Sequence, residues 1–451
     1  MHRIIIHNLG PVVSCELECS QFMTLTGFQA SGKSTIAKTI YYFRTIKEDI
    51  VQLVQRQAFD SVQAVVFEEE EGDYGIGYRM DLVTGLERFL CQKFRMVFGT
   101  MGGMSKEMRV EYYFTSECYL SVFLDKNAKR HLSDRICVRF SDTLVTFLRN
   151  KNRSFPVAPT GISEHEMRIL KIELCQLFDD FCSTVYIPAG RSMLTLLSQQ
   201  FGYIYATMDN FQKRSMDLCT RDYLERILRV KAEFSDGLVG LLEYFSERNT
   251  VSSEIVEQAL KLISKILRGD YRCRNGEEQI VLDNGNVIKI NFSSSGQQEC
   301  VWILNLLFYY LLQKKRMLFI IEEPESHLFP ASQKYMTELI ALVMNCNHSV
   351  VLTTHSPYVL GTLNNLLYAH IVSVNEHKHT CEIIHNSFWL DYHRFYAWFV
   401  KEGTIDNCMD NEIHMIMNEK IDEISKVIND DFDRLLELHN PDQEGGMPTC
   451  L

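Results

Sequence analysis

The chain has 451 residues, 46% of them apolar and 23% charged, which is ordinary usage for a globular protein with room for two or three lobes. Its formal net charge of −12 argues against a chain that coats itself in nucleic acid but leaves room for one local basic groove. The 14 cysteines include no C-x-x-C pair, so neither a zinc site nor a disulfide framework is indicated, and a cytoplasmic location fits best. No signal peptide is visible, and the most apolar stretch, 301–312, is too short to span a bilayer.

Strands at the start of the chain lead into a glycine-rich loop. They are expected at 3–9, 15–19 and 22–26. Residues 27–34 then read Gly-Phe-Gln-Ala-Ser-Gly-Lys-Ser, a full G-x-x-x-x-G-K-[ST] phosphate loop, before an apolar-sided helix. In this context backbone N–H groups and a helix N-terminus bind phosphate; the alternative is a turn that binds nothing. The residues expected to contact a nucleotide are Gly27, Gln29, Ala30, Ser31, Gly32, Lys33, Ser34 and Thr35.

The pattern after the loop changes from helical to β. The helix is expected to continue through Val54. The acidic run at 68–73 is interpreted as a solvated loop, with a metal site as the alternative. Alternating apolar residues between 108 and 148 predict a three-stranded antiparallel meander, with turns at 125–130 and 141–142.

A capping box and a short strand follow the meander. Ser163-x-x-Glu166 predicts the start of a helix whose apolar side extends to Phe181. The strand expected at 184–187 ends in Pro-Ala-Gly-Arg. Arg191 at its end either faces a phosphate or lies on the surface of a turn.

The middle of the chain is predicted to be mainly helical. Helices are expected at 193–198, 215–245 and 253–267. They are too short and too poorly heptad-repeated for a long coiled coil, so a compact lid or interaction surface is expected. The segment 278–291 predicts a hairpin across Asp283-Asn284-Gly285, interpreted as a type I′ turn.

Polar residues stand at the ends of the next apolar elements. The run at 317–321 breaks into Glu322 and Glu323. Two acids at the carboxyl end of a buried parallel strand are expected to hold a hydrated Mg²⁺ and an attacking water. A Ser-Gly-Gln-Gln cluster precedes an apolar helix at 300–312, and a later strand ends in His355.

The remaining segment predicts a helix at 358–367, a strand at 369–375 and an amphipathic helix at 412–438. No TOPRIM or HNH nuclease domain is evident after His355. A nuclease that works with this chain is therefore expected to be a separate protein.

The order of these motifs resembles that of the ABC-like ATPases: phosphate loop, serine–glycine signature, acidic strand, histidine strand. Glu322-Glu323-Pro-Glu-Ser-His-Leu-Phe-Pro and Thr353-Thr-His-Ser-Pro are similar to segments of bacterial anti-phage defence ATPases in the RecF, OLD and SMC group, of the Septu (PtuA) and PARIS (AriA) kind. The resemblance is tight over 1–60 and 275–375. It implies an α/β fold, an ABC-type P-loop ATPase head with an antiparallel β-lobe and a helical insertion.

The resemblance also implies the roles of the site residues. Glu322 holds Mg²⁺ through water together with Ser34, Glu323 is the catalytic base, and His355 is the switch histidine. Glu322 departs from the commoner Asp at its position, which marks the defence-type branch. The signature expected to contact ATP on a second subunit comprises Ser295, Gly296 and Gln298.

Four regions are expected. They are an N-terminal ATPase lobe with the β-lobe at 1–192, a helical insertion or lid at 193–274, a C-terminal ATPase lobe at 275–400, and a helix with a tail at 401–451. The expected function is ATP binding and hydrolysis in head-to-head dimers that control a separate HNH or TOPRIM nuclease, with DNA as a further candidate partner and no membrane. The alternatives are a RecF-like DNA-repair ATPase and a nucleotide-gated scaffold with little turnover.

Overall fold

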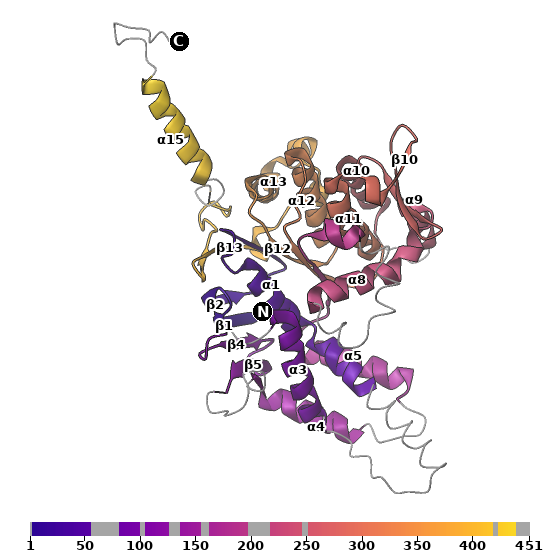
Figure 1. Cartoon of the computed structure of the whole chain (residues 1–451), viewed down its shortest axis with the longest axis vertical. Coiled ribbons are helices and arrows are strands. Elements are labelled where there is room, and N and C mark those ends of the chain that lie inside the picture. Colours follow the sequence, from indigo (N-terminus) through magenta and orange to yellow (C-terminus); the bar gives the residue numbers. More distant parts are fainter. Residues whose placement is uncertain are drawn as a thin grey trace, which may run out of the picture.

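A computed structural model describes residues 2–55, 81–99, 104–125, 136–154, 162–196, 217–245, 251–417 and 423–438. A six-stranded sheet in the order β14-β13-β3-β12-β11-β7 forms the centre of the fold (Figure 1). The strands from β13 to β7 run parallel, and β14 is antiparallel at one edge. The strands are β3 (Phe22–Gly27), β7 (Ser183–Ile187), β11 (Met317–Glu322), β12 (Ser349–Thr353), β13 (Phe395–Lys401) and β14 (Thr404–Asn407).

Both faces of the sheet are buried, which explains why its inner strands are continuous apolar runs. Successive side chains of a strand point to opposite faces. Accordingly, Phe319 and Ile321 of β11 lie in one hydrophobic core, whereas Leu318 and Ile320 lie in a second. The sheet is therefore covered by a layer on each side, and the α/β class predicted from the sequence is confirmed.

The N-terminal layer contains an antiparallel β-lobe in the order β2-β1-β4-β5-β6. The predicted meander at 108–148 is confirmed, but it also joins the two strands at the start of the chain. The capping box of Ser163 and Glu166 is present at the predicted helix. This layer consists of β1 (Arg3–Leu9), β2 (Val12–Glu18), α1 (Lys33–Arg44), a helical segment at 46–55, α3 (Leu82–Phe98), β4 (Arg109–Tyr113), β5 (Tyr119–Leu124), β6 (Ile136–Phe140), α4 (Asp142–Ser154) and α5 (Glu164–Leu177).

The layer on the other face is mainly helical and includes the predicted insertion. The side chains of α8, α9 and α10 share one core with those of α11, α12 and α13, so this segment packs within the lobe. The division at 193 and 274 stays a prediction. The elements are α8 (Leu218–Val230), α9 (Gly237–Phe245), α10 (Ser253–Leu267), β8 (Asp270–Arg274), β9 (Glu277–Val281), β10 (Val287–Lys289), α11 (Ser295–Leu311), α12 (Pro330–Asn345) and α13 (Pro357–Ile383).

A buried carboxylate joins the small β8–β10 sheet to α11. Glu278 is fully buried and accepts hydrogen bonds from the Tyr271 hydroxyl (2.8 Å), the Trp302 indole (2.9 Å) and the Lys231 ammonium (2.8 Å). Three donors satisfy a charge that would otherwise destabilise the core. The hairpin is thus held on the helix that begins at Ser295.

The predicted hairpin is present, but its turn is not type I′. A type I′ turn needs positive φ at both central residues. Of Asp283, Asn284 and Gly285, only Gly285 has positive φ (80°). Hydrogen bonds from Gly285 N to Leu282 O and from Leu282 N to Asn286 O, both 2.8 Å, instead form a tight turn followed by a left-handed glycine.

Two predictions in the C-terminal part were wrong. The predicted strand at 369–375 lies inside α13, because its β-branched residues follow an unbroken helical segment that starts at Pro357. The predicted helix at 412–438 does not begin at 412, since Asp410 Oδ1 accepts N–H bonds from Glu412 and Ile413 and forms a local turn instead. Strands β13 and β14 were not predicted.

Smaller corrections concern element ends. Residues 141–142 form the start of α4 instead of a turn, and α5 ends at Leu177, which leaves Phe181 exposed. The predicted helix at 215–245 breaks before α9, where a Cβ at Gly237 would lie 2.7 Å from the Tyr271 carbonyl oxygen. The acidic run at 68–73 and most of the turn at 125–130 lie outside the described residues.

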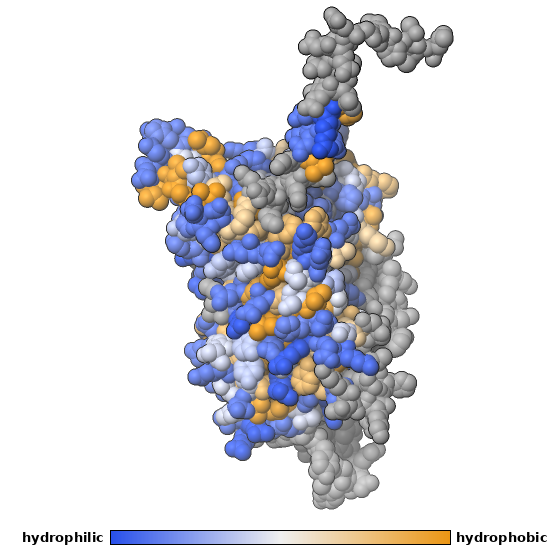
Figure 2. Space-filling model, turned by 90° about the vertical axis from the view of Figure 1, so that its left-hand side faces the viewer, coloured by the Kyte–Doolittle hydropathy of each residue, from blue (hydrophilic) through white to orange (hydrophobic). Residues whose placement is uncertain are grey.

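Helix α15 (Glu423–Leu438) projects away from the rest of the chain (Figures 1 and 2). Its apolar side chains Val427, Ile428, Phe432 and Leu435 are exposed beside acidic residues. Within the part of the chain that the structure covers, no helix is long and apolar enough to cross a membrane.

Candidate nucleotide-binding site

The predicted motifs meet at the carboxyl edge of the central sheet. Strand β12 lies between β3 and β11, so the segments that follow these three strands are neighbours. Thr354 N donates to Leu25 O (3.0 Å), and Glu323 N donates to Thr353 O (2.9 Å). Ligands in parallel sheets bind at this edge. The phosphate loop, the two acids and His355 are thus brought together as expected.

The phosphate loop has the backbone that its glycines permit. Gly27 and Gly32 have φ of 130° and 115°, values that side-chain-bearing residues rarely adopt. A Cβ at Gly27 would lie 2.2 Å from the Val400 carbonyl oxygen, so β13 closes against the loop. The Lys33 ammonium donates to the carbonyls of Gly27 (2.8 Å) and Phe28 (2.7 Å). The cation therefore lies inside the loop, where the sequence motif predicts it.

Charge interactions connect the loop lysine with the acids. Burial lowers the pKa of Lys33, whereas Glu323 and Glu325 oppose that shift. The carboxylate of Glu325 is buried and accepts hydrogen bonds from the Thr354 hydroxyl (2.7 Å) and the His355 N–H (3.0 Å). Glu325 thereby holds the loop that carries the histidine.

Glu323 and His355 form a pair at the mouth of the site. Glu323 Oε1 lies 3.6 Å from His355 Nδ1. This interaction lowers the pKa of Glu323 and, although partial burial opposes it, raises the pKa of His355. The Ser326 hydroxyl lies 3.4 Å from Glu323 Oε2. At neutral pH Glu323 is therefore an ionised hydrogen-bond acceptor, as expected of a residue that orients water.

Glu322 has the surroundings expected of a metal ligand. Its side chain is 5% exposed, and Oε2 accepts the Ala189 N–H at 3.2 Å. Oε1 is buried and accepts no hydrogen bond of acceptable geometry from the described residues, although the buried Tyr186 hydroxyl interacts with this carboxylate. A buried carboxylate oxygen without a donor needs a partner, and Mg²⁺ prefers hard oxygen ligands. With the exposed hydroxyl of Ser34 at the start of α1, these residues fit a hydrated Mg²⁺.

The signature segment begins α11, although Ser294 and not Ser295 caps the helix. Ser294 Oγ accepts the Gln297 N–H at 3.3 Å in a capping box. Ser295 is exposed at the first helical position, and a Cβ at Gly296 would lie 2.8 Å from the His327 carbonyl oxygen. The Gln298 amide donates to the carbonyls of residues 290 and 293, both at 3.1 Å. The nucleotide contacts of Ser295, Gly296 and Gln298 stay predictions.

Both interpretations of Arg191 were wrong, because its guanidinium is fully buried among backbone carbonyls. Its carboxylate partner is Glu299, 3.0 Å away and 1% exposed at its side chain. Sequence reasoning missed Glu299. The available signal was an acid placed directly before an apolar helix, where a charge is retained only if it is paired.

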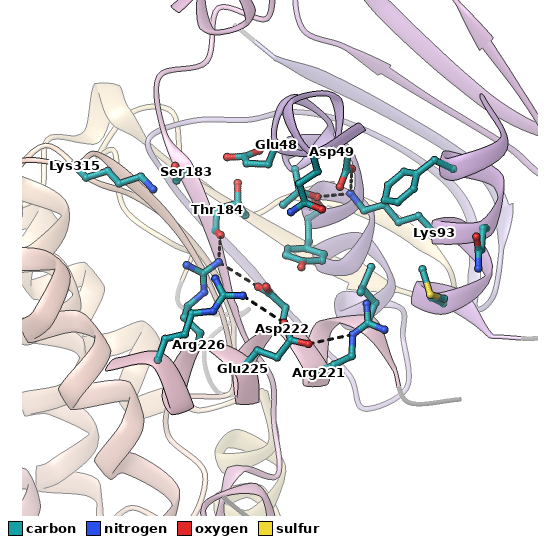
Figure 3. Close-up of a pocket in the computed structure, with 18 residues that line it drawn as sticks. Glu48, Asp49, Lys93, Ser183, Thr184, Arg221, Asp222, Glu225, Arg226 and Lys315 are labelled. Atoms are coloured by element: carbon teal, nitrogen blue, oxygen red, sulfur yellow. Dashed lines mark hydrogen bonds and ion pairs between the residues drawn. The ribbon is translucent and has the colours of Figure 1, made fainter. Parts of the chain in front are cut away.

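A separate polar cavity of about 780 Å³ lies between α1, α3, α8 and the start of β7 (Figure 3). Ser183 and Thr184 on its wall begin β7, so the cavity lies toward the amino edge of the sheet, opposite the nucleotide site. Several of its charges are paired: Arg226 donates to Asp222 (3.2 Å) and to Thr184 O (3.1 Å), and Lys93 pairs with Asp49. The cavity is therefore lined largely by charged side chains and is separate from the candidate nucleotide site.

Comparison with known families agrees with this geometry. Residues 183–360 match the family model described as an AAA ATPase domain. The matched segment contains Arg191, Glu299, Glu322, Glu323 and His355, but not the phosphate loop. No curated protein matches the chain significantly. The family match and the site geometry both agree with an ATPase domain.

Solved structures similar to the chain include three SMC heads. One, bound to the C-winged helix domain of ScpA, is 10% identical with a TM-score of 0.39, covering 90% of this chain and 96% of that chain. The SMC head domain from Thermotoga maritima is 11% identical with a TM-score of 0.34 (90% and 97% covered). The Pyrococcus furiosus head with an extended coiled coil, bound to the C-terminal domain of ScpA, is 11% identical with a TM-score of 0.36 (98% and 100%). At these TM-scores the likeness carries no functional argument.

Proposed function

We propose that this protein is an ATPase whose ATP site is completed by the signature segment of a second copy. The observation that carries the proposal is the convergence of the phosphate loop, Glu322, Glu323 and His355 at one sheet edge around the Lys33 ammonium. Phosphoryl transfer depends mainly on positioning and charge stabilisation. These residues supply both.

The side chains divide the chemistry among them. The loop N–H groups and Lys33 hold the β- and γ-phosphates. When bound at Ser34 and Glu322, Mg²⁺ supplies positive charge to the same phosphate oxygens. Glu323 accepts a hydrogen bond from the attacking water and aligns it with the γ-phosphorus. His355, whose pKa is raised by its interaction with Glu323, donates to the γ-phosphate in its protonated form.

Association of two copies closes the site in this proposal. The exposed Ser295 lies at the N-terminus of α11, where the first N–H groups and the helix dipole favour an anion. Phe292 and Phe329, next to the signature and to the segment after Glu323, are 81% and 73% exposed. Exposed aromatic side chains are typical of interface anchors. ATP bound to one copy would thus favour docking of the other.

At the level of the cell, we assign the ATPase to a cytoplasmic anti-phage complex, in which ATP-dependent dimerisation controls a separate nuclease of HNH or TOPRIM type. The resemblance of the 322–330 and 353–357 segments to defence ATPases supports this assignment. DNA is the candidate trigger. A RecF-like repair ATPase is the competing outcome of the tests below.

Complementation between variants tests the composite site. Lys33→Ala should abolish ATP binding, and Ser295→Arg should spare ATP binding but block association and hydrolysis. In a mixed dimer, one site has an intact loop facing an intact signature, so mixing should restore up to about half of the wild-type activity. Lys33→Ala mixed with Glu323→Gln is the matched control without recovery, because each site then keeps one of the two defects. Full activity of Ser295→Arg alone would refute the composite site.

Phage challenge tests the cellular role. The chain is co-expressed with the nuclease encoded beside it, and protection against phage is measured for the wild type and for Lys33→Ala. Protection that disappears in the variant supports the defence role. A chain without a neighbouring nuclease gene, whose ATPase is stimulated by DNA ends, would instead be a repair ATPase.

A further inference from the structure

Arg191 is a fully buried cation in which each nitrogen of the guanidinium has at least one acceptor. Nε donates to Glu299 O (3.2 Å), and Nη1 donates to Pro188 O (2.5 Å) and Glu322 O (2.6 Å). Nη2 donates to Glu323 O (2.8 Å) and pairs with Glu299 Oε1 (3.0 Å). A guanidinium has five such donors in a planar fork, and here they make four hydrogen bonds and one ion pair. The side chain therefore fixes the relative positions of three chain segments.

Two of these acceptors flank an unusual backbone conformation. Glu323 has φ of 42°, in the left-handed region that side-chain-bearing residues rarely occupy. Such a conformation persists only when its surroundings hold it in place. Arg191 donates to the carbonyl oxygens of Glu322 and Glu323, and Glu323 N donates to Thr353 O (2.9 Å). The direction of the Glu323 side chain follows from this backbone.

The acceptors on Glu299 connect Arg191, and through it the backbone of Glu323, to the signature helix α11. Glu299 lies in the second turn of α11, and its carboxylate accepts the N–H groups of Arg191 (3.0 Å) and Ser192 (2.6 Å). The same helix contacts the loop after β11, because Gly296 packs directly on the His327 carbonyl. The signature helix and the catalytic loop are therefore joined at two places within one chain.

We infer that Arg191 is a positioning residue that holds the backbone of Glu323 in its active conformation and ties it to the signature helix through Glu299. The inference rests on the proposed function, in which Glu323 aligns water at the ATP of its own chain while the signature serves the ATP of the partner. When the signature helix binds the partner's ATP and shifts, Glu299 moves with it. The shift is passed on to the Arg191 guanidinium and so to the backbone of Glu323. Arg191 itself touches no nucleotide.

Arg191→Lys tests this role, because it keeps the charge but cannot bind four carbonyls and a carboxylate. We expect the dissociation constant of ATP·Mg²⁺ to stay within about threefold of wild type and kcat to fall about 100-fold, as expected for a misplaced reacting group. Unchanged kcat, or weakened ATP binding with kcat retained, would overturn the inference. The matched control is Arg226→Lys, at a partly buried arginine in the cavity of Figure 3, which should leave kcat within about twofold.

Mixing experiments locate the defect. If Arg191 acts on Glu323 of its own chain, Arg191→Lys mixed with Lys33→Ala should recover no activity, like the Glu323→Gln mixture. Recovery as strong as that of Ser295→Arg with Lys33→Ala would place the effect in the signature and overturn the inference. No recovery in the Ser295→Arg mixture itself, with heterodimers present, means that both sites must act together, and the kcat of Arg191→Lys then decides the inference.

A second variant covers the case in which Arg191→Lys does not fold. Arg191→Met combined with Glu299→Met removes both charges, so no buried ion is left without a partner. The double variant should bind ATP·Mg²⁺ like wild type and lose turnover to the same extent. If it folds and hydrolyses ATP at the wild-type rate, Arg191 has no positioning role.

Discussion

Two buried glutamates allow a sharp test of the metal site, because Glu322 accepts one hydrogen bond of acceptable geometry from the described residues and Glu278 accepts three. Glu322 Oε2 accepts the Ala189 N–H, and Oε1 accepts no hydrogen bond of acceptable geometry from the described residues, although the buried Tyr186 hydroxyl interacts with this carboxylate. Glu278 accepts three hydrogen bonds, one of them from a lysine. A group kept for a ligand should be unfavourable for the ligand-free fold, whereas a structural group should be favourable. The replacements to compare are Glu322→Gln and Glu278→Gln.

The expected magnitudes follow from these partners. An unsatisfied buried polar group costs about 1–3 kcal/mol, so removing the Glu322 charge should leave the free energy of unfolding unchanged or raise it by up to about 2 kcal/mol. The glutamine oxygen can still accept the Ala189 N–H. Glu278→Gln instead leaves the buried Lys231 without its counter-charge and should lower the free energy of unfolding by about 3 kcal/mol.

Thermal unfolding with and without ATP·Mg²⁺ measures both effects. Ligand at one hundred times its dissociation constant should stabilise the wild type by about 2.7 kcal/mol. Glu278→Gln should show the same ligand-induced increase from a lower starting midpoint. Glu322→Gln should start at or above the wild-type midpoint and lose most of the increase. The reasoning is refuted if Glu322→Gln destabilises the ligand-free protein as much as Glu278→Gln does, or if it keeps the full increase.

Three further predictions concern single side chains. Glu323→Gln should bind ATP·Mg²⁺ with wild-type affinity but lose at least about 100-fold in kcat and accumulate as a dimer in light scattering; wild-type turnover would mean that another group is the base. Because the pKa of His355 is raised above 6.5, turnover should fall as pH rises through that higher value, and His355→Gln should lose this alkaline limb; a pH–rate profile of unchanged shape contradicts the role. Burial lowers the pKa of His348 to about 4 in the folded protein. As the pH falls from 6.5 to 4, this histidine is therefore protonated in the unfolded chain before it is protonated in the folded one, and the free energy of unfolding should fall by about 3 kcal/mol. Urea unfolding at the two pH values should show a smaller decrease in the free energy of unfolding for His348→Asn than for wild type. His7→Asn, at an exposed histidine, should show the same decrease as wild type.

The parts of the site that were predictable are those in which local sequence and local geometry agree. The glycines of residues 27–34 permit the backbone conformation of the loop. The strand before them is buried, and the helix after them has a buried apolar side. The same holds for Glu322 at the end of a run whose six residues are all buried. In these segments the local preference and the fold require the same conformation.

Other elements were missed because long-range packing decides them. The segment 395–401 pairs with β3, which lies more than 360 positions earlier in the chain, so no local pattern indicates its place in the sheet. The β-branched residues at 371–374 favour a strand, yet the helix that begins at Pro357 continues past Gly361 and reaches them without a break. Val374 is 79% exposed on that helix, so burial did not favour a strand there either.

The Arg191 cluster was missed for the same reason, because the sequence pointed to Arg191 itself but to none of its partners. Arg191 and Glu299 are 108 positions apart, and their partners at Glu322 and Glu323 are backbone carbonyls, which any residue carries. Nothing in the side-chain sequence near β11 signals that its carbonyls need a donor. That need arises because Glu323 adopts a left-handed backbone at the sheet edge, where its carboxylate faces the nucleotide in the proposed function. The candidate catalytic acid can therefore be predicted from its motif. The residue that positions it is identified only from the hydrogen bonds that the backbone carbonyls of the loop accept in the folded chain.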